Sequence, residues 1–405
     1  MVIMHSRAPL AALLHVYCKH YCQVLLCALV AVLLVLLALV PANTGTPVQK
    51  MLTSPMQGGA WVRSPTAAPR VVFVVAQTGY SPGWCRMMLS AIVSRVSVVS
   101  IGFGGNYSHT VRISWLLNYM EEAGLRDEDV VVMFDGGDTF FTRPLWAKEA
   151  VKDFLAKTAP SADAFNATAV HRGEASAPML FSTEPKCWAP QVDLVVPSGP
   201  EEQYERCRWF YERLWKVANS SADQRLVQSP PSGFRYLTAG LMVGRVWAIR
   251  EAFKAYASLL AKSDKWWCDQ TIWALLFVWS VTQDPVVDPA LRTRYGLLSL
   301  DYNNSFLLIP RYTPFGSPAI IHFAGPIYIW WRLLPIYLNY TDWFQPLRQS
   351  PTFAQEARDL LQTTTVAVFD VKGRESATRF SDVCSLKDVL DPQWLSRTLE
   401  KVPGM

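Results

Sequence analysis

The pattern of apolar and polar stretches along the chain predicts an α/β fold. The run Val71–Ala76 is continuously apolar and rich in β-branched residues, and further short runs follow at Val96–Phe103 and Val130–Phe134. Such runs are typical of strands that are buried on both faces of a sheet. Between the second and third runs, residues 109–124 place apolar side chains at helical spacing and end at a glycine. This alternation of strands and helices predicts an α/β domain with a mostly parallel sheet.

An apolar segment near the N-terminus predicts a membrane anchor. The segment Val24–Val40 has no charge and no strong turn former, and as a helix it would rise about 25 Å, at the short end of what spans a bilayer. Arg7 and Lys19 precede it, and no acidic residue does. Because basic flanks stay in the cytosol, we expect a cytosolic tail (1–20), a type II anchor (21–40) and a lumenal remainder. A cleaved signal peptide is the alternative, although its apolar region is usually shorter.

The residues after the anchor have the character of a lumenal protein. Residues 41–69 are rich in Pro, Thr, Ser and Gly and predict a flexible stem. The net charge of +5 is spread out, without a basic block, which argues against nucleic-acid binding. The N-glycosylation acceptor pattern occurs at Asn106, Asn166, Asn219, Asn303 and Asn339.

The cysteines beyond the anchor would meet an oxidising compartment. They are Cys85, Cys187, Cys207, Cys268 and Cys384. Because their number is odd, at least one is expected to stay free or to pair with another chain. The sequence leaves their connectivity open.

Two acidic residues follow the third apolar run, in the stretch FDGGD (134–138). Ligands of open parallel sheets bind beyond the carboxyl ends of the strands, and the two glycines allow a tight turn there. Two carboxylates at short range repel unless a cation lies between them, and Mg²⁺ or Mn²⁺ takes such ligands while bridging to phosphates. The pair Asp135 and Asp138 is therefore a candidate metal site. A solvated turn is the ordinary alternative.

Further stretches bring polar or small residues to the ends of apolar segments: STEPKCWAP (182–190), TAGLMVG (238–244), CDQTIW (268–273) and HFAGP (322–326). We expect a small-residue turn and then a strand within Tyr236–Arg245. Asp269 should lie at the start of an apolar helix, and His322 at the end of a strand.

Taken together, these five stretches resemble the metal-dependent GT-A glycosyltransferases, most closely the glycosyltransferase domain of procollagen lysyl hydroxylases and procollagen galactosyltransferases. The family has the same kinds of motif in the same order, and here they cover roughly residues 70–340. No single motif is specific, but their order is. The resemblance implies a GT-A, Rossmann-like mixed sheet with flanking helices over residues 70–345. Residues 346–405 would form a C-terminal appendage that either extends the sheet or stands beside it.

The resemblance also implies roles for the matching residues. Asp135, Asp138 and His322 would hold Mn²⁺ (or Mg²⁺), with Asp138 also close to a UDP-sugar donor. Asp269 and Glu184 would be the catalytic carboxylates on the acceptor side. Asp269 would equally suit a helix N-cap, and His322 taken alone would suit a buried core position.

The same resemblance places the donor among small and aromatic residues. Ala239 and Gly240 would let the sugar lie against the backbone, and Trp188 would form one wall of the cleft. Trp188 taken alone is equally compatible with ordinary core packing. Arg112 falls near the family's basic nucleotide contact.

The resemblance therefore implies a metal-dependent enzyme that moves a hexose from a UDP-sugar to a hydroxyl of a protein or glycan acceptor. It would be anchored in the Golgi or endoplasmic reticulum membrane. Two positions depart from the family: Cys268 stands in place of an acid, and Tyr328 in place of a Lys that Arg332 would have to replace. A catalytically degenerate scaffold and a surface glycoprotein are the alternatives.

Overall fold

The computed structural model describes residues 68–220, 233–310, 317–324, 333–334 and 336–391. The chain divides into two compact units, residues 1–59 and 60–405, and all described residues belong to the second. The expected tail, the anchor and nearly all of the stem lie outside the described residues, as do Tyr328 and Arg332. None of the helices in the described ranges has the length and apolar character to cross a bilayer.

The first described elements follow the expected alternation of strands and helices. They are β1 (Val71–Ala76), α2 (Pro82–Val93), β2 (Val98–Phe103), α3 (Arg112–Glu122), β3 (Val130–Phe134), β4 (Thr139–Phe141), α4 (Pro144–Lys157), α5 (Ala167–Arg172) and β5 (Met179–Glu184). The middle of the chain forms α6 (Gln203–Ser220), β6 (Tyr236–Arg245), α7 (Val246–Leu260) and α8 (Asp269–Thr282). The remaining elements are β7 (Leu298–Leu300), β8 (Leu307–Leu308), β9 (Ile320–His322), α10 (Phe344–Gln349), α11 (Pro351–Thr363), β10 (Thr365–Asp370), β11 (Glu375–Arg379), α12 (Phe380–Val383) and α13 (Leu386–Leu390).

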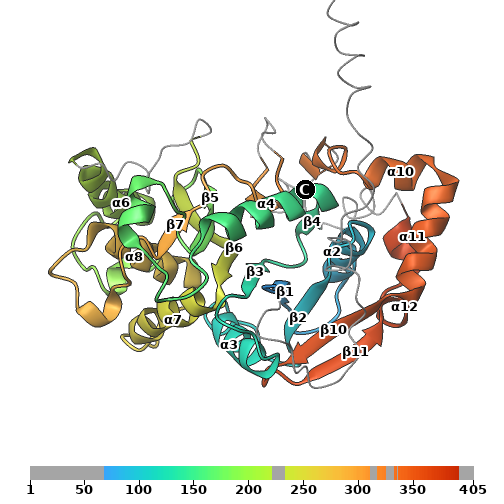
Figure 1. Cartoon of the computed structure of the whole chain (residues 1–405), viewed down its shortest axis with the longest axis horizontal. Coiled ribbons are helices and arrows are strands. Elements are labelled where there is room, and N and C mark those ends of the chain that lie inside the picture. The colour runs from blue at the N-terminus through green and yellow to red at the C-terminus, as the bar shows by residue number, and fades with distance from the viewer. Residues whose placement is uncertain (1–67, 221–232, 311–316, 325–332, 335, 392–405) are drawn as a thin grey trace, which may run out of the picture. The chain divides into compact units, whose positions relative to one another are not determined.

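The main sheet is mixed but mostly parallel, in the order β11-β10-β2-β1-β3-β6-β5-β7. Among these strands, β6 and β11 run against the others. Helices flank the sheet (Figure 1), so the expectation of an α/β fold with a mostly parallel mixed sheet is confirmed. The carboxyl ends of β3, β5 and β7 lie at one edge of the sheet, where ligands of such folds bind.

The expectation of a turn at the start of Tyr236–Arg245 is wrong. All of these residues belong to the single strand β6, which is buried along its whole length. Its second half pairs with β3, and its first half extends past the end of β3 and pairs with β5. The ladder with β5 is interrupted in β6 itself, because Phe181 pairs with Met242 and the next residue, Ser182, pairs with Thr238, which leaves residues 239–241 without a partner in β5. The small residues of β6 therefore serve close packing rather than chain reversal.

A small second sheet, in the order β4-β9-β8, crosses the edge where β3 ends. Strand β4 pairs antiparallel with β9, and Thr139 lies opposite His322. The chain passes directly from β3 through the FDGGD turn into β4. This connection brings the end of β9 to the carboxyl end of β3.

The C-terminal segment extends the main sheet. The segment contains helix α11 and strand β10, and β10 pairs in parallel with β2 (Figure 1). A disulfide between Cys85 in α2 and Cys384 ties this segment to the first helix of the sheet. The C-terminal segment was expected either to extend the sheet or to stand beside it, and in the structure it extends the sheet. Strand β11, with its largely exposed polar sequence, was not expected from the pattern.

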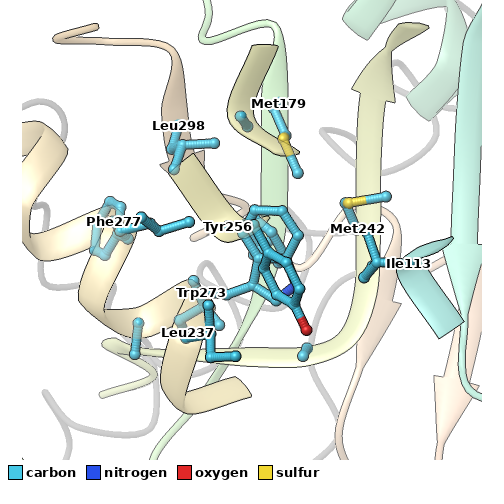
Figure 2. Packing of buried hydrophobic residues seen from close by; sticks show 14 of the residues in the cluster. Ile113, Met179, Leu237, Met242, Tyr256, Trp273, Phe277 and Leu298 are labelled. Carbon is cyan, nitrogen blue, oxygen red and sulfur yellow. The ribbon is translucent and has the colours of Figure 1, made fainter. Parts of the chain in front are cut away.

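Apolar cores cover both faces of the sheet. On one face Tyr256 and Trp273, from α7 and α8, pack with their ring centroids 4.7 Å apart against Met179 and Met242 of the strands (Figure 2). Helix α8 is apolar on all sides, and its residues from Thr271 to Val281 are all buried. A helix of that kind must lie inside a domain. It gives the sheet edge a rigid support.

Candidate functional site

The FDGGD turn places two carboxylates beside a buried histidine. The backbone N–H of Asp135 donates to the carbonyl of Gly240 (2.9 Å), which keeps Asp135 in line with β3. The N–H of Phe323 donates to the carbonyl of Asp138 (2.9 Å), which fixes Asp138 at the entry to β4. As a result, His322 Nε2 lies 3.3 Å from Asp138 Oδ2 and 3.7 Å from Asp135 Oδ2. The three metal-type residues expected from the sequence therefore meet at one point.

The His322 ring is enclosed and strongly influenced by its neighbours. The residue is 3% exposed, and its Nδ1 has no hydrogen-bond partner among the described residues. Burial alone would lower the pKa of His322, but the negative charges of Asp138 and Asp135 outweigh burial and raise the pKa to about 9. The imidazole thus directs one nitrogen at the carboxylates, and the other faces Gly240 of β6 without a hydrogen-bond partner among the described residues.

Glycines on two sides let the backbone approach this cluster. A Cβ at Gly240 would lie 2.5 Å from His322 Nδ1, so β6 leaves room for the ring only because residue 240 has no side chain. On the other side, a Cβ at Gly83 of α2 would lie 2.7 Å from the carbonyl oxygen of Gly137 in the FDGGD turn. Residue 240 is therefore small because the histidine ring is its immediate neighbour, whereas its expected contact with a sugar stays a prediction.

Arg112, the first residue of α3, is buried at the centre of the site. It forms ion pairs with Asp135 and, through Nε, with Asp269 Oδ2 (2.6 Å), and its Nη2 donates to the carbonyl of Ala239 (3.1 Å). Burial would lower the pKa of Arg112, but Asp269 and Asp135 hold it well above its usual value. Burial would likewise raise the pKa of Asp135, but Arg112 and His322 lower it overall. Arg112 is thus a permanent cation inside the site.

Asp269 is the first residue of α8, and its carboxylate is bound to Arg112 instead of capping the helix. The N-cap position belongs to Cys268, whose side chain makes no capping hydrogen bond. Asp269 is 2% exposed. Its placement beside Asp135 and Arg112 joins the start of α8 to the end of β3.

Gln270 is the residue whose role the sequence did not reveal. Its Nε2 donates to Glu184 Oε1 (2.6 Å) and to the carbonyl of Trp188 (3.0 Å). Its Oε1 accepts from the N–H of Ala239 (3.1 Å). One amide side chain therefore links the end of β5, the loop after it and β6. The only sequence feature that indicated a role for Gln270 was its position directly after Asp269 at the start of a helix.

All the candidate residues belong to one continuous set of contacts. The metal-type cluster reaches Arg112 through Asp135, and Arg112 reaches Asp269 and Ala239. Gln270 then connects Ala239 to Glu184 and Trp188. Cys268 is buried; its backbone N–H donates to Gln191 Oε1 (2.9 Å), and burial raises the pKa of its thiol.

Asp135, Asp138 and His322 have the ligand atoms that a divalent metal ion needs, although their present arrangement does not form a metal site. As arranged, no group of three or more His, Cys, Asp or Glu side chains within the described ranges could hold a metal ion, and an ion pair with Arg112 engages one Asp135 oxygen. Nevertheless Asp135, Asp138 and His322 offer a set of carboxylate oxygens and an imidazole nitrogen, which suits Mn²⁺. A bound ion would replace the direct contacts of His322 with the two aspartates.

Comparison with models of known protein families gives no match. Comparison with curated proteins gives none either.

Proposed function

We propose that the protein is a metal-dependent glycosyltransferase of the GT-A type, which moves a hexose from a UDP-sugar to a hydroxyl of a protein or glycan acceptor. The observation that carries the proposal is the meeting of Asp135, Asp138 and His322 at the carboxyl end of β3. These residues come from two segments separated by more than 180 positions. Two carboxylates and an imidazole at the ligand-binding edge of an α/β sheet suit a divalent ion that contacts a diphosphate.

The donor side of the proposed site is built from Asp135, Asp138, His322 and Arg112. When bound, Mn²⁺ would supply positive charge to the leaving diphosphate, which is the largest need of such a transfer. The guanidinium of Arg112 keeps Asp135 ionised and oriented before any ligand arrives. The His322 ring fills the space beside Gly240, and the carbonyl of Ala239 accepts from Arg112, so within this proposal both small residues position the donor-side groups and Gly240 does not contact the sugar.

The acceptor side is assigned to Glu184, Asp269 and Trp188. Glu184 is half-buried at the end of β5, and its Oε1 accepts a hydrogen bond from Gln270, which leaves the carboxylate fixed in orientation. A fixed and partly exposed carboxylate is suited to take the proton of an attacking hydroxyl. Asp269 is buried against Arg112, so within this proposal it acts by holding the guanidinium and by adding negative charge beside the site.

A lumenal location is part of the proposal. Two disulfides, Cys85–Cys384 and Cys187–Cys207, are of the kind that forms in oxidising compartments, and Cys268 is the cysteine that stays free in the described chain. The acceptor asparagines Asn106, Asn166, Asn303 and Asn339 are all exposed, as glycosylation requires. Anchoring by residues 21–40 in the Golgi or endoplasmic reticulum membrane would place the site in the lumen.

A degenerate scaffold is the second candidate, and one observation favours it. The ion pair between Arg112 and Asp135 already neutralises one of the aspartates that a metal ion would need. In that case the protein would bind neither Mn²⁺ nor UDP-sugars.

The deciding experiment is a screen of UDP-sugars for Mn²⁺-dependent UDP release by the purified full chain. We expect release with one or a few donors, its loss in chelator, and its loss in Asp138→Asn. Asp163→Asn is the matched control, because Asp163 is exposed and lies outside the site. Turnover retained in Asp138→Asn would contradict the assignment, and absence of both Mn²⁺ binding and UDP release would favour the scaffold.

A further inference from the structure

A surface of aromatic and basic side chains lies beside Glu184, outside the metal-type cluster. We name it the aromatic–basic face, and it consists of Lys186, Trp188, Tyr204, Arg208, Trp215 and Arg235. The face adjoins the site directly: Glu184 lies opposite Tyr236 in the sheet, and the N–H of Arg235 donates to the carbonyl of Glu184 (3.3 Å). Gln270 binds both Glu184 and Trp188.

Helix α6 supplies one stripe of this face. Tyr204, Arg208, Tyr211 and Trp215 recur at spacings of four, three and four residues, so they line one side of the helix. Tyr211 points into the core, where its hydroxyl accepts from the N–H of Leu237 (3.2 Å). Tyr204 and Trp215 are half-buried and Arg208 is exposed, so the outer members of the stripe remain accessible.

The loop after β5 is fixed against this stripe. Cys187, which lies between Lys186 and Trp188, forms a disulfide with Cys207 of α6. The carbonyl of Trp188 accepts from Gln270, and the ring centroids of Trp188 and Tyr204 are 5.8 Å apart. A platform held by a disulfide and a buried amide loses little freedom when a ligand binds, which favours affinity.

Two cations of the face, Lys186 and Arg235, stack on its rings and form no ion pair with a carboxylate among the described residues. Lys186 Nζ lies 4.4 Å from the ring centroid of Tyr204, and the guanidinium of Arg235 lies 5.4 Å from that of Trp215. Neither of these residues nor Arg208 forms an ion pair within the described part of the chain. By contrast, Arg206 of the same helix binds Asp193 (3.5 Å).

Carboxylates border the face on the side of Arg208. Glu205 and Glu212 lie three and four residues from Arg208 on α6, and Glu212 adds negative charge near Tyr236. Arg208 and Arg235 both act on Tyr236, where their charges oppose the rise in the pKa of the phenol that burial causes. The donors of the stacked cations are therefore available to a ligand that lies over the rings.

We propose that the aromatic–basic face binds the acceptor, and that the acceptor is a glycan carrying anionic groups. Half-exposed Trp and Tyr rings present flat apolar surfaces that suit the faces of sugar rings, whereas an acidic peptide has no such faces. Stacked cations without a carboxylate partner suit carboxylate, sulfate or phosphate groups. The proposal rests on the proposed function for the chemistry at Glu184. Because Glu184 repels an anion, the sugar that reacts is a neutral neighbour of the charged one.

The test is calorimetric binding to the full chain in detergent, without metal ion or donor. The probes are a hyaluronan octasaccharide, its carboxyl-reduced neutral analogue and a chondroitin sulfate octasaccharide, so that uronate and sulfate are distinguished. We expect the charged probes to bind at least about tenfold more tightly than the neutral one, with a preference that weakens as salt is added. Lys186→Ala and Arg235→Ala should each weaken binding about two- to fivefold. The double charge reversal of Lys186→Glu with Arg235→Glu should abolish the preference.

Arg213→Ala is the matched control. Arg213 also stacks on a ring of α6, with its guanidinium 4.5 Å from the ring centroid of Trp209, but it lies nine residues after Tyr204 and so on the opposite side of the helix. Binding in this variant should equal that of the wild type. Unfolding curves of all variants exclude loss of the fold as the cause of weaker binding.

The outcomes separate this proposal from the proposed function. Equal binding of the charged and neutral probes, no binding of either charged probe, or equal competition by polyglutamate would overturn the glycan proposal. If charged glycans bind but no UDP-sugar is turned over, the proposed function fails while the face stands. If turnover occurs and none of the cation variants affects the acceptor, only the present proposal fails.

Discussion

Replacement of Gly240 by alanine tests how closely β6 is fitted to the proposed metal ligands. The added Cβ would lie 2.5 Å from His322 Nδ1 and 2.7 Å from Cε1, whereas ordinary contact begins near 3.4 Å. The ring or the strand would therefore have to retreat by about 0.9 Å (3.4 minus 2.5). His322 is 3% exposed and cannot swing into solvent.

The cost of this overpacking should be about 1–3 kcal/mol, reduced by about 0.4–1 kcal/mol because alanine restricts the unfolded chain more than glycine does. We expect a net loss of about 1–2 kcal/mol in the free energy of unfolding, measured in urea. Because the displaced ring carries a proposed ligand atom, Mn²⁺ affinity should fall about 10- to 100-fold, measured by the electron paramagnetic resonance signal of free Mn²⁺.

Gly79→Ala is the matched control, since a Cβ there would meet nothing within 4 Å. It should leave Mn²⁺ affinity unchanged and stability equal or slightly higher. If Gly240→Ala behaves like Gly79→Ala in both measurements, the fitted arrangement of Gly240 and His322 is refuted.

Three further predictions concern other parts of the structure. In chelator the free energy of unfolding should fall by about 3 kcal/mol between about pH 6 and pH 10. The pKa of His322 is about 9 in the folded protein and about 6.5 in the unfolded chain, so protonation of His322 stabilises the fold fully below pH 6.5. That stabilisation is lost as the pH rises through 9. His322→Asn should lack this part of the pH dependence. Replacing Cys85 and Cys384 by serine should lower the free energy of unfolding by about 2 kcal/mol more than replacing Cys187 and Cys207 does, because the two disulfides close loops of 299 and 20 residues. Equal losses in urea unfolding would contradict this dependence on loop length. Gln270→Ala should lower kcat in the UDP-release assay while the KM for the donor stays within about twofold. The substitution releases Glu184 and Trp188 and does not contact Asp135, Asp138 or His322. A change confined to the donor KM would instead assign Gln270 to the donor side of the site.

Local patterns were sufficient for the elements that are buried on every side. The β-branched run of β1, the apolar run of β3 and the wholly apolar α8 are each recognisable because burial on every side requires apolar residues at every position. The same reasoning places Asp135 and Asp138 at the end of a buried strand. It failed for β6, because Ala239 and Gly240 indicate a turn unless the strand pairings on either side of them and the histidine ring beside Gly240 are known.

The sequence by itself therefore determined the central strands and helix α8, the polar residues at their ends and the odd number of cysteines after residue 40. Only the tertiary structure decided which of those residues meet. Arg112 binds Asp269 across 157 positions, Gln270 binds Glu184 across 86, and Cys85 pairs with Cys384 rather than with a nearer cysteine. The periodicity of apolar residues indicates whether a side chain is buried or exposed to solvent. The partner that supplies those surroundings comes from another segment, and its position depends on the order in which the strands join the sheet.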